Sequence, residues 1–146
     1  MTDLVVDASF VAKVVYPEPH REQAIALIRE AAEKEYQMTA PALLYSELMN
    51  VVRRRQRQER EPLAVALASL DILLGLPIET VDDRSLHRDT LRLSQRCSLS
   101  VFDALYVALA GVRVYDFRTG DRKLLNAIGG RLPSVRWIGD YRLSIT

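Results

Sequence analysis

The fold of this chain is decided by one stretch, which reads Leu99-Ser100-Val101-Phe102-Asp103-Ala104-Leu105-Tyr106-Val107-Ala108-Leu109-Ala110. Its apolar residues recur at three- and four-residue steps with no Pro or Gly between them, which predicts a helix. Ser100 is a candidate N-cap, because its hydroxyl can accept a hydrogen bond from a free N–H of the first turn. Asp103 shares the apolar face with Tyr106 and Val107. An unpaired carboxylate there costs on the order of several kcal/mol, so we expect a partner: a cation of the protein, a proton or a metal ion.

Length and composition indicate a globular protein. The chain has 146 residues, which fits one domain over residues 1–146, and its hydrophobic fraction of 49% argues against disorder. The formal net charge is +1, so any nucleic-acid binding must come from a local patch and not from global charge. Cys97 is the only cysteine, which excludes a disulfide within the chain and suits a reducing cytosol.

The amino-terminal sequence favours a cytoplasmic location. Asp3 precedes the first apolar run, and the basic segment of a signal peptide is missing. No apolar run approaches the roughly 20 residues of a membrane span. We therefore expect no association with a membrane.

The order of elements predicts an α/β fold. Leu4-Val5-Val6 is a short apolar run without alternation, as in a strand buried on both faces of a parallel sheet. Further strands are expected at 36–40, 76–81, 112–117 and 135–138, with helices between them, one of which is expected to start at Pro41. Strands that alternate with helices predict a parallel sheet covered on both faces. The glycine-rich motifs of dinucleotide and P-loop sites are absent from the sequence.

Four acidic residues stand at positions that favour a site. Asp7 and Asp121 follow predicted strands, and Glu47 and Asp103 interrupt apolar helix faces. The carboxyl ends of parallel strands meet at one edge of the sheet, so the four side chains could converge there. Each also has a structural alternative: Asp7 and Asp121 could cap the helices that follow them, and Glu47 could reach solvent from the edge of its stripe.

The chemistry of four carboxylates favours a hard divalent cation. Like charges in one cleft raise each other's pKa, and the neighbouring sequence does not supply a Lys or Arg to each. Oxygen ligands alone suit Mg²⁺ or Mn²⁺ better than zinc.

Four motifs carry a family resemblance. They are Leu4-Val5-Val6-Asp7-Ala8-Ser9, Tyr45-Ser46-Glu47-Leu48, Phe102-Asp103-Ala104-Leu105-Tyr106-Val107-Ala108-Leu109-Ala110 and Thr119-Gly120-Asp121-Arg122-Lys123-Leu124-Leu125. In order and spacing they resemble the PIN-domain ribonucleases, and the length is similar to that of VapC-type toxins of type II toxin–antitoxin systems. The resemblance runs from Leu4 to about Ile138. It implies a PIN-like three-layer α/β/α sandwich with a central, mainly parallel sheet.

The resemblance also implies a site and a reaction. Asp7, Glu47, Asp103 and Asp121 would be the catalytic and metal-binding residues of a Mg²⁺- or Mn²⁺-dependent endoribonuclease. The hydroxyls of Ser9 and Thr119 would lie beside them, where they could hold metal-bound water or a phosphate oxygen.

The implied partners are an RNA substrate, a VapB-like antitoxin that covers the cleft, and a second copy of the chain in a homodimer. Basic side chains could contact RNA or the antitoxin, unless they are only a solvated surface; the candidates are Arg53, Arg54, Arg57, Arg122 and Lys123. Two other functions remain open at this point: a binding module with little activity, and a metal-dependent DNA nuclease or phosphatase that uses the same carboxylates.

Overall fold

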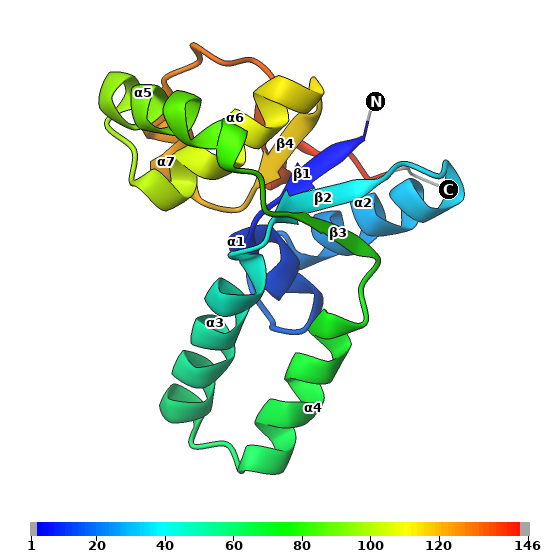
Figure 1. Ribbon diagram of the computed structural model, residues 1–146. Helices are drawn as coiled ribbons and strands as arrows, with labels where there is room; N and C mark the ends of the chain where they lie inside the picture. The colour runs from blue at the N-terminus through cyan, green and yellow to red at the C-terminus, as the bar shows by residue number, and fades with distance from the viewer. Residues whose placement is uncertain (1–2, 144–146) are drawn as a thin grey trace.

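The computed structural model describes residues 3–143 and has a parallel sheet at its centre (Figure 1). In this part of the chain five strands form the sheet, in the order β3-β2-β1-β4-β5. Their bounds are β1 Leu4–Val6, β2 Met38–Pro41, β3 Ile78–Val81, β4 Asp116–Thr119 and β5 Val135–Trp137. All four neighbouring pairs are parallel, and Val5 of the central strand β1 is aligned with Thr39 and Phe117. The predicted parallel sheet is confirmed.

Strand order determines which helices cover which face. The chain runs outward from β1 to β2 and β3, then crosses back to β4 on the other side of β1 and continues to β5. Because βαβ crossovers are right-handed, the two halves place their helices on opposite faces. The first half holds α1 Ala8–Val11, α2 Arg21–Glu33, α3 Leu44–Glu59 and α4 Leu63–Leu74; the second holds α5 His87–Cys97, α6 Val101–Arg113 and α7 Arg122–Ile128. Residues 3–143 also contain three short 3₁₀ turns, at Ala12–Val14, Arg84–Leu86 and Ile138–Asp140. The three-layer sandwich is confirmed.

Helix α6 packs against the middle of the sheet, in contact with β1, β2 and β4. Six of its residues are buried: Ala104, Tyr106, Val107, Ala108, Leu109 and Ala110. The Ser100 hydroxyl accepts a hydrogen bond from the Asp103 N–H at 3.1 Å, so the predicted N-cap is confirmed. The apolar stripe of residues 99–110 therefore builds one side of the core.

Two predicted boundaries were wrong. Pro41 is the last residue of β2, and α3 begins only at Leu44. The strand predicted at 112–117 starts at Asp116, because α6 continues to Arg113 and ends at Val114 in a left-handed conformation (φ 57°). The strand tendency of β-branched residues is weak, and here the pairing of Asp116 with Leu4 sets where β4 begins.

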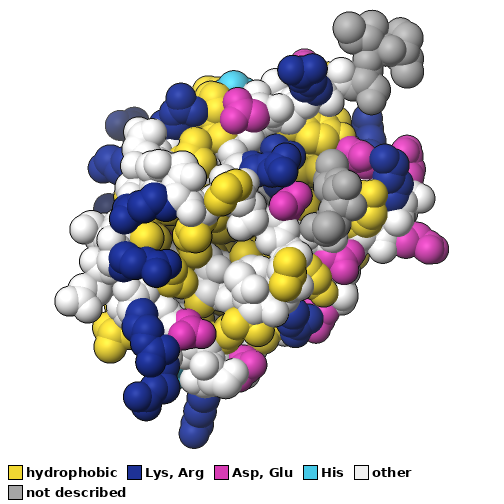
Figure 2. All heavy atoms as spheres, turned by 90° about the horizontal axis from the view of Figure 1, so that it is seen from above, with side chains coloured by type: hydrophobic (Ala, Val, Ile, Leu, Met, Phe, Trp, Pro, Cys, Tyr) yellow, Lys and Arg dark blue, Asp and Glu magenta, His cyan; other side chains and the backbone are white. Residues whose placement is uncertain are grey.

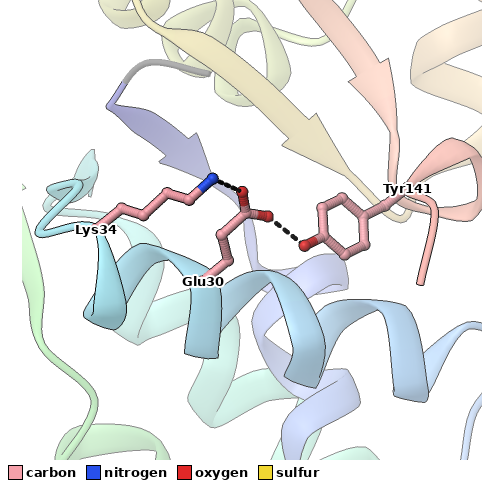
Figure 3. A network of polar contacts seen from close by, with 3 residues as sticks. All are labelled: Glu30, Lys34 and Tyr141. Atoms are coloured by element: carbon pink, nitrogen blue, oxygen red, sulfur yellow. Dashed lines mark hydrogen bonds and ion pairs between the residues drawn. The ribbon is translucent and has the colours of Figure 1, made fainter. Parts of the chain in front are cut away.

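The C-terminal segment is tied to α2 by polar contacts. The Tyr141 hydroxyl donates a hydrogen bond to the Glu30 carboxylate, which also pairs with Lys34 at 2.9 Å (Figure 3). The contact fixes the segment after β5 against the face of the sheet that α2 covers.

Charge and shape are uneven over the surface. Lys and Arg side chains gather along one margin of the face in Figure 2, while the net charge of the whole chain is only +1. Helices α3 and α4 form a hairpin that projects from the rest of the molecule (Figure 1). Within residues 3–143, the helices are too short or too polar to cross a bilayer.

Candidate active site

The site lies where the strand order reverses. β1 and β4 are neighbours, yet the chain leaves them toward opposite edges of the sheet, and such a switch point opens a crevice at the carboxyl ends of the strands. Asp7 follows β1, and Asp121 follows β4 by one intervening residue. Glu47 and Asp103 come from the first turns of α3 and α6. Four helix N-termini thus each bring one carboxylate, in the place where the helix dipole stabilises negative charge.

Asp7 is the most deeply buried of the four acids, with 7% of its surface exposed. As the N-cap of α1, its Oδ1 accepts hydrogen bonds from the Phe10 N–H at 2.9 Å and from the Ser9 hydroxyl at 2.7 Å. Its Oδ2 accepts one from the Thr119 hydroxyl at 2.5 Å. Burial raises the pKa of Asp7, and these three hydrogen bonds lower it only in part.

The hydroxyls of Ser9 and Thr119 connect β1 to the loop after β4. Ser9 Oγ accepts a hydrogen bond from the Gly120 N–H at 3.0 Å, and Thr119 Oγ1 accepts one from the Asp121 N–H at 2.9 Å. Each hydroxyl also donates a hydrogen bond to the Asp7 carboxylate, so each of them both donates and accepts. The structure places them beside the carboxylates, where they fix the orientation of Asp7 and the position of Asp121.

Glu47 is held by Tyr106, a residue that the sequence reasoning counted only as part of the apolar face. The buried Tyr106 hydroxyl donates a hydrogen bond of 2.6 Å to Glu47 Oε1. Burial and the Glu47 carboxylate raise the pKa of Tyr106, so its hydroxyl stays protonated and remains a donor. Tyr106 follows Asp103 by three residues and so lies one turn further along α6, but this spacing gives no sign that its hydroxyl faces α3.

The four acids influence one another electrostatically, and we call them the acid ring: Asp7, Glu47, Asp103 and Asp121. Burial raises the pKa of Glu47, and the charges of Asp7 and Asp103 raise it further. Burial likewise raises the pKa of Asp103, with a contribution from Asp121, and Asp121 also acts on Asp7. The structure therefore brings together all four acids that the sequence singled out.

Asp121 combines both roles considered for it. Its Oδ1 caps α7 by accepting hydrogen bonds from the Lys123 N–H at 2.9 Å and the Leu124 N–H at 3.2 Å. One carboxylate oxygen is thus used for folding, and the charge of the group still reaches Asp7 and Asp103.

The donor set of the acid ring fits a hard divalent cation. No ion pair among residues 3–143 involves a member of the ring, so the protein does not neutralise these charges itself. All donors are carboxylate and hydroxyl oxygens, which Mg²⁺ and Mn²⁺ prefer. Among residues 3–143, no three His, Cys, Asp or Glu side chains lie close enough together to hold a metal ion as they stand. The four acids are therefore spaced more widely than the ligands of a bound cation.

The basic candidates fall into two groups. Arg122 and Lys123 directly follow Asp121, and the Arg122 guanidinium lies 4.1 Å from the centre of the Trp137 ring. Arg53, Arg54 and Arg57 lie on the projecting part of α3, about 9–15 Å along the helix from Glu47 at 1.5 Å per residue. Only the first group borders the acid ring.

Comparison with known proteins agrees with this architecture. The family model of the PIN domain matches residues 4–127. The crystal structure of PAE2754 from Pyrobaculum aerophilum has a TM-score of 0.69 at 21% sequence identity, over 94% of this chain and 92% of that one. The Mycobacterium tuberculosis toxin VapC20 (Rv2549c), which cleaves the sarcin–ricin loop, has a TM-score of 0.61 at 17% identity, over 86% and 95% of the two chains. No curated protein gives a significant match. At these identities the two solved structures show a shared fold alone.

Proposed function

This chain belongs to the PIN domain family, and on that premise we propose that it is a metal-dependent endoribonuclease, the toxin of a toxin–antitoxin pair. The observation that carries the proposal is the acid ring: four carboxylates at the carboxyl end of a parallel sheet, with raised pKa values at three of them and no ion pair to any of them within residues 3–143. Keeping such charges together is costly for folding, and binding a divalent cation offsets that cost. The likeness in fold to a toxin that cleaves RNA supports the choice of substrate.

Asp7, Glu47, Asp103 and Asp121 would hold Mg²⁺ or Mn²⁺, which when bound supplies an activated water and stabilises charge on the phosphate. Glu47 presents one fixed oxygen to Tyr106 and leaves the other for the site. Asp7 is oriented by Ser9 and Thr119. One of the four carboxylates would also accept the proton that the attacking water loses.

The phosphates of RNA and the carboxylates of the acid ring are both negative and repel each other. Binding of RNA therefore needs cations near the ring. Arg122 and Lys123 are exposed and directly follow Asp121, which suits contacts to RNA phosphates. A cation–π contact with Trp137 already restricts the Arg122 guanidinium, so Arg122 loses less conformational entropy when it binds RNA.

The projecting hairpin of α3 and α4 suits a protein partner. A groove between the two helices has a mainly apolar lining of Met49, Val52, Arg53, Gln56, Leu63, Ala66, Leu67 and Leu70. Exposed arginines lie on α3 beside the groove, namely Arg53, Arg54 and Arg57. An apolar segment that carries acidic residues complements this surface, and we assign it to the antitoxin. A homodimer and a cytoplasmic location complete the proposal, as does a single domain for the whole chain.

The test is cleavage of a mixed RNA pool by the purified wild type and by Asp103→Asn, with Mg²⁺, with Mn²⁺ and with EDTA. We expect metal-dependent cutting by the wild type and a loss of at least about a hundredfold in Asp103→Asn, because one ligand of the cation is neutralised. Asp71→Asn, the same change at an exposed position on α4, serves as the matched control and should cleave normally.

Two outcomes would contradict the proposal. Cleavage that survives both EDTA and Asp103→Asn would come from another enzyme. Preference for DNA or for small phosphate esters over RNA would instead support the alternative nuclease or phosphatase.

A further inference from the structure

Lys13 is the one buried lysine among residues 3–143, with 7% of its surface exposed. It lies in the 3₁₀ turn that continues α1, four residues after Ser9, and so on the same side of the chain as Ser9. Its stem packs against the loop after β4: a Cβ on Gly120 would lie only 2.7 Å from Lys13 Cε and 3.0 Å from the Ser9 carbonyl oxygen. A side chain at position 120 would therefore displace the end of Lys13 and crowd the backbone of Ser9.

The ammonium of Lys13 has no partner in the part of the chain that the structure describes. No carboxylate lies within ion-pair distance, and no hydrogen bond involves the side chain. Fixing a lysine side chain costs up to about 2 kcal/mol in conformational entropy, and partial desolvation of the ammonium adds to that cost. An uncharged side chain such as methionine would fill the same space without the desolvation. The sequence therefore places here a positive charge that no side chain of residues 3–143 pairs.

The position of Lys13 indicates what it meets. Gly120, against which the stem packs, stands between Thr119, which binds Asp7, and Asp121 of the acid ring. The stem is buried and the ammonium reaches the surface beside this loop. The ammonium therefore lies next to the loop that carries Asp121, on the side of the acid ring that Asp7 and Asp121 form.

We propose that Lys13 is a phosphate-binding residue of the site, whose ammonium contacts a non-bridging phosphate oxygen of the bound RNA strand. The proposal rests on the proposed function, since it takes RNA as the ligand of the acid ring. An ammonium is a compact charge with three donors and binds phosphate well. Because packing against Gly120 fixes the stem, the charge is already in place when RNA arrives, and it offsets repulsion between phosphate and carboxylates.

The test is RNA binding by Asp103→Asn protein, in which cleavage is disabled, with and without Lys13→Met. The methionine keeps an unbranched stem of similar length against Gly120 and removes the charge. For a short single-stranded RNA we expect Kd to rise about tenfold, a loss of about 1.4 kcal/mol. The slope of log binding constant against log salt concentration should fall by about 0.7, the value for one phosphate contact on a single strand.

Two further variants separate binding from folding and from net charge. Lys13→Arg should restore most of the affinity and the salt slope. Lys34→Gln removes one positive charge from the exposed surface of α2, and it should leave both unchanged. The proposal is overturned if Lys13→Met matches Lys34→Gln in affinity and slope, or if none of the variants binds RNA.

Failure of this proposal and failure of the proposed function give different results. If the wild type cleaves RNA and Lys13→Met retains its kcat/KM and salt dependence, the role of Lys13 is wrong and the nuclease stands. If the wild type does not cleave but RNA binding depends on Lys13, the nuclease is wrong and the phosphate contact stands.

Discussion

Burial raises the pKa of the Asp7 carboxyl above its ordinary value, and the hydrogen bonds to it offset this only in part. The folded chain therefore binds this proton more tightly than the unfolded chain does. Its contribution to stability is fully present below the unfolded pKa and is lost as the pH rises through the folded pKa. At neutral pH the Asp7 carboxyl thus makes the fold less stable than it is at low pH, which is the expected cost of a group that we propose binds a cation.

Asp7→Asn should accordingly raise Tm at pH 8 while abolishing cleavage. An asparagine still caps α1, because its side-chain oxygen can accept from Phe10 and Ser9. The gain in Tm over the wild type should shrink as the pH falls, since the wild-type carboxyl then takes up its proton. Thermal unfolding of the wild type and of Asp7→Asn at pH 8 and at successively lower pH values measures the effect.

Added Mg²⁺ supplies the control for that experiment. It should raise Tm of the wild type, because an ion that binds only the folded state stabilises it, and it should have little effect on Asp7→Asn. If Asp7→Asn had a lower Tm than the wild type at pH 8, this would contradict the conclusion that burial of the Asp7 carboxyl destabilises the fold.

Among the helices and strands, the join between α6 and β4 shows backbone strain. Val114 ends α6 with a left-handed φ of 57°, and its side chain is 81% exposed. A β-branched residue is unfavourable in this region, and no packing of the side chain compensates. The two hydrogen bonds that its N–H donates, to the carbonyls of Ala110 and Gly111, hold it there.

Val114→Gly should therefore stabilise the protein by about 1 kcal/mol, which corresponds to a rise of roughly 2–4 °C in Tm. Thermal unfolding is the measurement, with Val112→Gly as the comparison inside the same helix. Val112 lies in the last turn of α6 with a helical backbone, so that second change should lower Tm, because glycine is less favourable than valine in a helix. A lower Tm for Val114→Gly would mean that its side chain stabilises the fold in some other way.

On the scale of the whole molecule, the acid ring and the α3–α4 hairpin are separate surfaces joined by one helix. Glu47 lies in the first turn of α3, and the residues of α3 that line the groove, from Met49 to Gln56, follow it along the same helix. A partner bound to the hairpin is thus close enough to reach the acid ring without sharing its residues.

Leu67→Glu, in the lining of the groove, should weaken binding of the antitoxin at least tenfold and leave RNA cleavage unchanged. We expect the antitoxin to be the small protein encoded by the adjacent reading frame, and calorimetry with that purified protein measures the loss. Val65→Glu changes an exposed residue of α4 outside the groove lining and should bind normally. If the wild type, Leu67→Glu and Val65→Glu bind the antitoxin equally well, the groove of the hairpin is not part of the interface.

The sequence alone determined the features that depend on neighbouring residues. Apolar periodicity predicted the order of strands and helices, and the cap at Ser100 and the acidic positions at helix starts were visible in it. These succeed because hydrogen-bonding and burial patterns repeat within a few residues. The end of α6 was predicted wrongly because β-branched residues favour a strand only weakly. The pairing of Asp116 with Leu4 of β1 determines where β4 begins.

Only the tertiary structure decided how distant residues meet. Thr119 contacts Asp7 from 112 positions away, Tyr106 contacts Glu47 from 59, and Lys13 packs against Gly120. The position of β4 beside β1 causes the first and third contacts, and the packing of α6 on the sheet causes the second. Strand order and crossover handedness are properties of the whole chain, so local sequence predicts candidate site residues but not which side chains hold them in place.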